Sequence, residues 1–218
     1  MDDSRPDEAD ARVRVLGVEQ LIDTGFSVIR RATIDYRRFD GSRQVVKREA
    51  YDRGNGAAIL LFDPSRDCVL LVRQFRYPAY ANPTARDAGT VDRGWLIEVP
   101  AGLLDDHLAA GLSPEQAIQR EVAEEAGVSV GTPRRIMELY SSPGSVTERL
   151  ALFASTYSAR DKTGAGGGLE AEGEDIQILE LTLDEAFAMI ATGEIADSKT
   201  VLLLLWAKLN GAELVATA

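Results

Sequence analysis

Three glutamates stand close together in the run Arg120-Glu121-Val122-Ala123-Glu124-Glu125, and this spacing suits divalent-metal chemistry. On an α-helix, at about 100° per residue, Glu121, Glu124 and Glu125 fall within an arc of about 100°. Like charges this close repel one another unless cations share them, and Mg²⁺ both prefers carboxylate oxygens and binds phosphate. Arg120 is placed to orient one glutamate through an ion pair. A solvated acidic helix face explains the same residues, and taken alone the run favours this simpler interpretation.

A helix that can position these carboxylates is predicted from Ser113 to Gly127. Ser113 is a suitable N-cap, Pro114 suits the first helical position, and Gly127 suits the position just after the helix. An apolar stripe lies beside the acidic arc and is made of Ile118, Val122 and Ala126. Because such a stripe packs on a sheet, we expect the glutamates to be held on a fixed surface.

The rest of the chain reads as a short tail, a small sheet and a larger domain. Residues 1–12 are polar and are predicted to be disordered, 13–53 alternate as in an antiparallel β-subdomain, and 54–212 form the main domain. In that domain strands are expected at Ala57–Phe62, Cys68–Phe75, Trp95–Val99, 134–141, 149–157 and Ile176–Leu181, helices at Asp184–Thr192 and Ser198–Leu209, and loops at 77–94 and 159–175.

Composition excludes several other classes of site and partner. The 218 residues carry a net charge of −11, which predicts no nucleic-acid partner and no anionic membrane surface. The single Cys68 excludes an internal disulfide and a cysteine-based zinc site. A serine hydrolase would have to use the only histidine, His107, which lies in a segment that reads as a loop. No apolar leader or membrane-spanning stretch is apparent, so we expect a cytoplasmic protein.

The longer pattern around the glutamates resembles the signature of the Nudix hydrolases. The second half of that signature matches at Arg120, Glu121, Val122, Glu124, Glu125, Gly127 and Val128. The first half departs from it. Gly102 lies four residues further from Arg120 than in the signature, and the signature's first glutamate falls at Leu112. We therefore expect an altered loop over Leu103–Leu112 and an intact catalytic helix.

Outside the signature the chain resembles the branch of this family that hydrolyses ADP-ribose and GDP-mannose. The similar runs include Tyr51–Gly56, Val72–Arg76, Pro100–Asp105, Leu139–Glu148 and Thr192–Ile195. The resemblance implies an α/β/α sandwich around a mixed β-sheet, with the small antiparallel β-subdomain at the N-terminus exchanged or packed across a homodimer. It also implies Mg²⁺-dependent cleavage of a pyrophosphate, with Mn²⁺ as a substitute ion. GDP-mannose is the favoured substrate, ADP-ribose the alternative and a non-catalytic nucleotide-sugar sensor the remote one.

The resemblance also assigns roles to individual residues. Glu121 and Glu125 correspond to metal ligands, Glu124 to a further or supporting carboxylate, and the Ala101 carbonyl, next to Gly102, to another ligand. Glu174 corresponds to a metal ligand or to the group that positions the attacking water, and Glu170 and Glu172 remain alternatives for this role. The implied substrate contacts are Lys47, Arg48, Glu49, Arg76, Gly102, Glu148 and Lys199.

Overall fold

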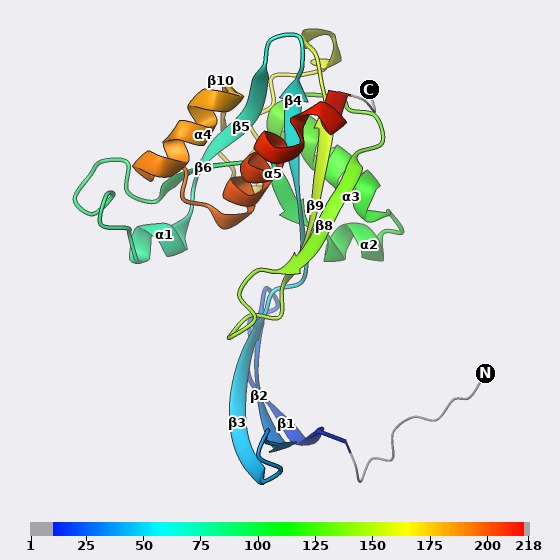
Figure 1. The fold of residues 1–218 in the computed structure, drawn as a ribbon, viewed down its shortest axis with the longest axis vertical. Coiled ribbons are helices and arrows are strands. Elements are labelled where there is room, and N and C mark those ends of the chain that lie inside the picture. Colours follow the sequence, from blue (N-terminus) through cyan, green and yellow to red (C-terminus); the bar gives the residue numbers. More distant parts are fainter. Residues whose placement is uncertain (1–10, 216–218) are drawn as a thin grey trace. The chain divides into compact units, whose positions relative to one another are not determined.

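The computed structural model describes residues 11–215, which separate into two compact units. One unit comprises Met1–Asn55 and Tyr140–Arg149, and the other comprises Gly56–Leu139 and Leu150–Ala218 (Figure 1). The disordered tail predicted for residues 1–12 lies almost wholly outside the described residues.

The first unit contains a three-stranded antiparallel sheet, as the alternating pattern predicts. Its strands, in the order β1-β2-β3, are β1 (Val13–Asp23), β2 (Val28–Arg37) and β3 (Arg43–Asp52). None of residues 11–55 and 140–149 is fully buried within the chain, and large apolar side chains such as Val15, Leu16 and Val18 are more than half exposed. A sheet with this much exposed apolar surface lacks a core of its own.

The second unit is built on a seven-stranded mixed sheet. Strands β10, β5, β4, β9 and β8 lie in that order, with β6 paired to β5 and β7 paired to β4. Strand β4 runs parallel to β9 and antiparallel to β5. The strands are β4 (Gly56–Asp63), β5 (Cys68–Phe75), β6 (Trp95–Glu98), β7 (Ala101–Leu103), β8 (Arg134–Tyr140), β9 (Arg149–Thr156) and β10 (Gln177–Thr182).

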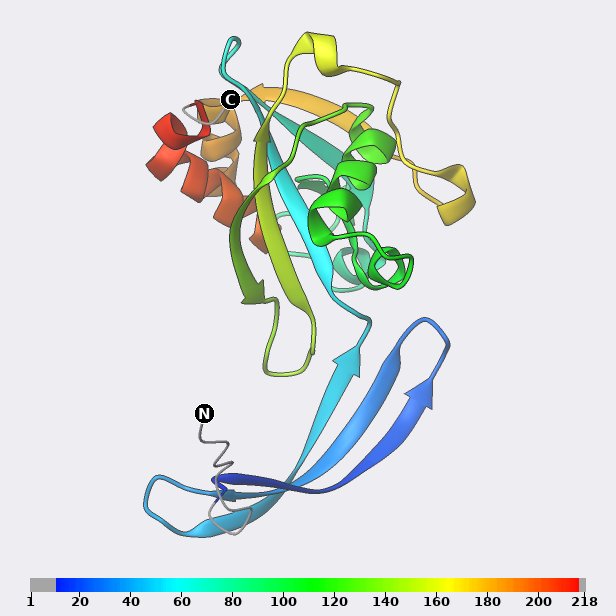
Figure 2. The same ribbon diagram turned by 90° about the vertical axis from the view of Figure 1, so that its right-hand side faces the viewer.

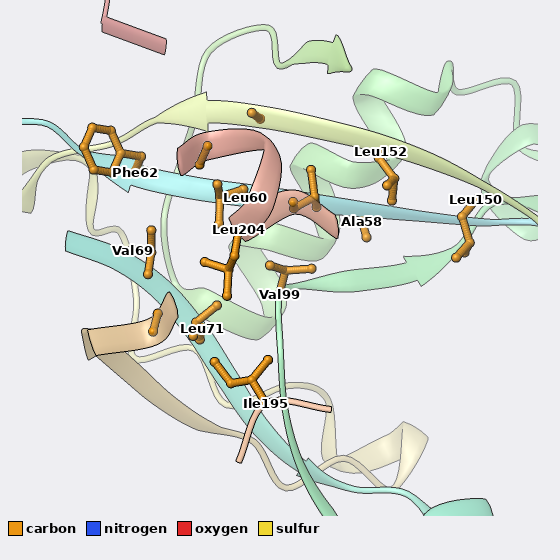
Figure 3. Packing of buried hydrophobic residues seen from close by; sticks show 14 residues of the cluster. Ala58, Leu60, Phe62, Val69, Leu71, Val99, Leu150, Leu152, Ile195 and Leu204 are labelled. Carbon is orange, nitrogen blue, oxygen red and sulfur yellow. The ribbon is translucent and has the colours of Figure 1, made fainter. Parts of the chain in front are cut away.

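Helices cover both faces of this sheet, so the predicted α/β/α sandwich is confirmed (Figure 2). The continuous apolar strand β4 explains the two layers, because alternate side chains point to opposite faces. Leu60 packs in one core cluster with α4 (Leu183–Thr192) and α5 (Ser198–Val215), as Figure 3 shows. Ile59 packs in the other cluster with α3 (Pro114–Glu121).

The two neighbouring leucines of α5 provide a test of this packing. Leu204 is fully buried and Leu205 is 39% exposed. Leu204→Ala is expected to lower the free energy of unfolding by about 3 kcal/mol, because it removes a core side chain and leaves a cavity. Leu205→Ala should cost less than about 1 kcal/mol. Urea denaturation of both variants measures the difference, and equal losses would contradict this account of the core.

The structure differs from the sequence-based prediction in three short segments. The segment containing His107 is a helix, α2 (Asp105–Ala109), instead of a loop, and the predicted loop 77–94 begins with the helix α1 (Tyr77–Ala81). Strand β7 was not predicted. In residues 11–215 no helix is long and apolar enough to cross a membrane.

Candidate active site

The acidic run lies where helix α3 widens into a π-helical turn. As predicted, Ser113 caps the helix, its hydroxyl accepting from the backbone N–H of Gln116, and Gly127 ends it with φ of 64°. Residues Val122–Ala126 form the π-helical turn, which changes the angular spacing of the last glutamates. The three carboxylates differ in exposure: Glu125 is buried, whereas Glu121 and Glu124 are partly exposed, and the charge of Glu121 acts on Glu125.

Glu125 is an ionisable group enclosed by the fold. Its side chain is 1% exposed, and its Oε2 accepts a hydrogen bond of 3.0 Å from the backbone N–H of Ala101. In the described part of the chain its other oxygen, Oε1, is buried without a hydrogen-bond partner. Burial raises the pKa of Glu125 to about 8 against the Ala101 hydrogen bond, and the charges of Glu121 and Glu174 add to the rise. A cation next to Oε1 would remove this cost.

Glu121 lies against Gly102, the glycine that is separated from Arg120 by four more residues than in the signature. A Cβ atom at Gly102 would stand 2.1 Å from both Cδ and Oε1 of Glu121, so only glycine leaves room for this carboxylate. The segment between Gly102 and Ser113, in which the four additional residues fall, contains helix α2, which packs near α3. The insertion therefore changes the connecting loop and leaves the approach of Gly102 to Glu121 intact.

Glu124 and Arg120 form the ion pair that the sequence predicts. Nε of Arg120 lies 2.9 Å from Oε1 of Glu124, one helical turn away. The pair is substantially exposed, so it contributes little to stability and serves mainly to fix the direction of Glu124.

A glycine-rich loop packs against the end of this helix and carries Glu174. The backbone N–H groups of Gly167 and Gly168 donate to the carbonyl oxygens of Glu125 and Glu124, at 2.9 and 3.1 Å. Oε2 of Glu174 accepts from the backbone N–H of Leu169 at 2.9 Å, and its charge acts on Glu125. The structure thus brings Glu174 near Glu125.

Glu170 and Glu172 are the alternatives to Glu174. Glu170 is exposed on a short 3-10 turn, and the side chain of Glu172 lies outside the described residues.

Two glycines of this loop permit a matched test of its packing. Gly166 and Gly173 both have positive φ, but only at Gly166 would a Cβ meet backbone, 2.6 Å from the Glu125 carbonyl oxygen. Gly166→Ala should destabilise the protein by about 3 kcal/mol, against about 1 kcal/mol of left-handed strain for Gly173→Ala. Thermal melts compare the variants, and hydrogen exchange at Gly167 and Gly168 reports the loop. An unchanged exchange rate in Gly166→Ala would contradict this packing.

A second group of charged residues surrounds Glu98, at the end of β6. Nε and Nη2 of Arg76 donate to its two oxygens at 2.9 and 3.0 Å, and Nζ of Lys199 lies 2.6 Å from Oε2. Lys199 also pairs with Asp197 at 3.0 Å. Burial works to raise the pKa of Glu98, but Lys199 and Arg76 outweigh it and hold this pKa below its ordinary value. The charge of Glu125 contributes to a raised pKa of Arg76, so the two side chains lie near each other.

The sequence pattern did not predict a role in the site for Glu98 or Asp197. A glutamate inside the apolar run Trp95–Val99 is the signal that could have revealed Glu98, since charged residues are rarely fully buried without a partner. The structure thus brings Arg76 and Lys199 together through a residue to which no role had been assigned.

The remaining predicted substrate contacts lie in the first unit, where the structure gives their neighbours only within that unit. Lys47, Arg48 and Glu49 are on β3, and Glu49 pairs with Arg31 at 2.6 Å. Glu148 lies in the Tyr140–Arg149 segment, and its carbonyl oxygen accepts from the backbone N–H of Ser141. Their roles toward a substrate stay predictions.

The donor set around Glu125 fits a hard divalent ion. Within residues 11–215 no three acidic, histidine or cysteine side chains converge as a preformed metal cluster. Mg²⁺ does not need one, because it commonly takes one or two carboxylates and keeps several waters. Among the described residues Glu125 has an unpartnered oxygen, and the charge of Glu121 acts on its carboxyl group.

Comparison with known proteins gives consistent results. The pattern of the NUDIX domain matches residues 52–204. A GDP-mannose pyrophosphatase of Citrobacter koseri is 45% identical over 186 residues, which cover 85% of this chain and 90% of that protein. One of Escherichia coli O139:H28 is 44% identical with the same coverage. The solved structure of an ADP compounds hydrolase covers 94% of this chain and 97% of its own, with a TM-score of 0.64 and 17% identity, a likeness of fold alone.

Proposed function

The chain belongs to the NUDIX family of hydrolases, and from this premise we propose that it cleaves the pyrophosphate bond of GDP-mannose in a Mg²⁺-dependent reaction. The products are GMP and mannose 1-phosphate. The observation that carries the proposal is the buried Glu125, with one unpartnered oxygen and two further carboxylates acting on it. The similarity to GDP-mannose pyrophosphatases over most of the chain supports this choice of substrate.

In this proposal Glu121, Glu125 and the Ala101 carbonyl hold the ion, with Glu124 supporting them and Mn²⁺ as a substitute. A bound divalent ion supplies charge compensation for the diphosphate and lowers the pKa of a coordinated water. Glu174 has an oxygen, Oε1, that Leu169 does not use, and this oxygen takes up the proton of the attacking water. Arg76 and Lys199 bind the diphosphate oxygens.

The substrate is tested by a hydrolysis screen with GDP-mannose, ADP-ribose, GDP-glucose, UDP-glucose and diadenosine polyphosphates at saturating Mg²⁺. Released phosphomonoesters are detected with alkaline phosphatase and a phosphate assay. We expect the highest kcat/KM with GDP-mannose. A higher kcat/KM with ADP-ribose would replace this substrate assignment, and the absence of any hydrolysis would favour a nucleotide-sugar sensor.

We further propose that the protein is a homodimer in which the three-stranded sheet covers apolar surface of a second copy. Support comes from the absence of any fully buried residue among 11–55 and 140–149, because a sheet is stable only when one face is covered. Multi-angle light scattering at micromolar concentration is expected to give twice the mass of the 23.6 kDa chain. A monomer mass would refute this proposal.

A cytoplasmic location completes the proposal. Cys68 is the only cysteine, so the chain forms no internal disulfide, a composition typical of a reducing compartment. Fractionation of cells with an antibody to the protein tests the location.

A further inference from the structure

The buried carboxylate of Glu98 connects the two cations to which the proposed function assigns the diphosphate. Glu98 is 1% exposed and Lys199 has a side-chain exposure of 12%, whereas Arg76 is 39% exposed and so reaches the surface. The three side chains come from distant parts of the sequence, and Glu98 is the residue that both cations bind.

One oxygen of Glu98 serves both cations. Oε2 accepts from Nη2 of Arg76 at 3.0 Å and from Nζ of Lys199 at 2.6 Å, while Oε1 accepts from Nε of Arg76 at 2.9 Å. A guanidinium bound in this two-pronged way has a fixed plane as well as a fixed position. The shared oxygen also sets the distance between the two cationic groups.

Holding two cations this close requires a negative partner between them. Without Glu98 the guanidinium and the nearly buried ammonium would repel each other, and of its two acidic partners among the described residues Lys199 would keep only Asp197. Asp197 is itself fixed, because its Oδ2 accepts from the backbone N–H and the hydroxyl of Thr200. The hydroxyl of Thr200 in turn accepts from the backbone N–H of Val99, the residue after Glu98.

We propose that Glu98 is a positioning residue that holds Arg76 and Lys199 as one binding pair for the diphosphate. The inference rests on the proposed function of this site. Glu98 engages Nε and Nη2 of Arg76, so within the described residues Nη1 is left to donate to a phosphate oxygen. Lys199 has three donors and uses two of them on Glu98 and Asp197, which leaves the third for a phosphate oxygen.

The segment that carries Glu98 also contacts Glu125, one of the carboxylates proposed to bind the metal ion. Three residues after Glu98, the backbone N–H of Ala101 donates to Oε2 of Glu125, and between them the carbonyl oxygen of Pro100 accepts from Ile59 of β4. Glu98 therefore places the cations relative to the carboxylates as well as to each other.

The test is a double-mutant cycle that measures binding of inorganic pyrophosphate with Mg²⁺ by calorimetry. Glu98→Gln keeps the shape of the side chain and removes its charge. It is expected to weaken pyrophosphate binding about 10- to 100-fold, the usual effect of losing a charge-assisted pair. In an Arg76→Gln background the same change should weaken binding less than about 3-fold, since interacting residues are not additive.

A buried carboxylate elsewhere in the sheet provides the matched control. Asp63 is 1% exposed and pairs with Arg66 at 2.6 Å, as Glu98 pairs with Arg76. Asp63→Asn should lower the melting temperature and leave pyrophosphate binding unchanged. If Glu98→Gln does not fold, Glu98→Asp takes its place in the cycle, because it keeps the charge and shortens the side chain.

Additive losses in the cycle, or an equal loss of binding in Asp63→Asn, would overturn the positioning role and leave Glu98 a structural residue. Hydrolysis kinetics give a second readout: we expect KM for GDP-mannose to rise more than kcat falls. Failure of the substrate proposal is recognised separately, by a wild-type protein that binds pyrophosphate but does not hydrolyse GDP-mannose. A non-additive cycle under those conditions would still support the role of Glu98.

Discussion

Glu125→Gln is expected to reduce the hydrolysis rate by about 10³-fold or more while the protein stays folded, because it removes the charge that we propose binds the ion. Glutamine has nearly the same shape and retains the oxygen that accepts from the backbone N–H of Ala101. The loss therefore concerns charge and not packing. Steady-state assays at saturating Mg²⁺ measure it.

The same substitution should stabilise the metal-free protein at alkaline pH. The pKa of Glu125 lies at about 8 in the fold, above the ordinary 4.5. A carboxyl whose pKa is raised by folding contributes stability that is complete below its unfolded pKa and is lost as the pH rises through the folded value. Without metal, the wild type should therefore lose stability between about pH 5 and pH 8, and at pH 8 Glu125→Gln should melt roughly 3–8 °C higher.

Melting curves in EDTA between pH 5 and 9 check this expectation, with Glu138→Gln as the control. Glu138 is a partly exposed glutamate of β8, and its substitution should change neither the pH dependence nor the rate. A wild-type melting temperature that stays constant over this pH range would show that folding does not raise the pKa of Glu125. Retention of a near-normal rate by Glu125→Gln would remove the central role of this residue.

Gly102→Ala is the second substitution with a large expected effect. Its Cβ would lie 2.1 Å from Cδ and Oε1 of Glu121, which is the far end of a flexible side chain. We therefore expect the carboxylate to move and the fold to remain. The Mg²⁺ concentration needed for half-maximal rate should rise about 10- to 100-fold, as when a supporting residue of a metal ligand is lost.

Gly131→Ala is the matched control for this change. A Cβ at Gly131 meets no atom within 4 Å, and neither glycine has a left-handed backbone. The control should keep the wild-type Mg²⁺ dependence and melting temperature. If Gly102→Ala also keeps the wild-type Mg²⁺ dependence, Glu121 does not bind the ion from its position against Gly102.

The predicted elements depended on signals that act locally, and these were largely confirmed. The run Cys68–Phe75 coincides with β5, and Ser113 and Gly127 mark the ends of the acidic helix. Apolar runs, caps and turn residues are local properties of the chain, so they can be read without knowledge of its partners.

The site was less predictable because its geometry depends on contacts between distant segments. Equal spacing of 100° per residue indicated that Glu121 and Glu125 lie close together, but it gave no sign that the π-helical turn and the glycine loop enclose Glu125. The link between Arg76 and Lys199 runs through Glu98, and no local pattern connects positions so far apart. For the same reason, the sequence did not indicate that Tyr140–Arg149 joins the first unit.

That discontinuous first unit limits how the chain can be cut into independent pieces. The backbone of Tyr51 bonds to Ser145 and Thr147, so the segment after β8 is paired with the end of β3. Truncation before Gly56 would leave those backbone groups without their partners, a source of instability and aggregation. Expression of the mixed sheet alone therefore needs a second edit, in which a short turn replaces the residues between β8 and β9.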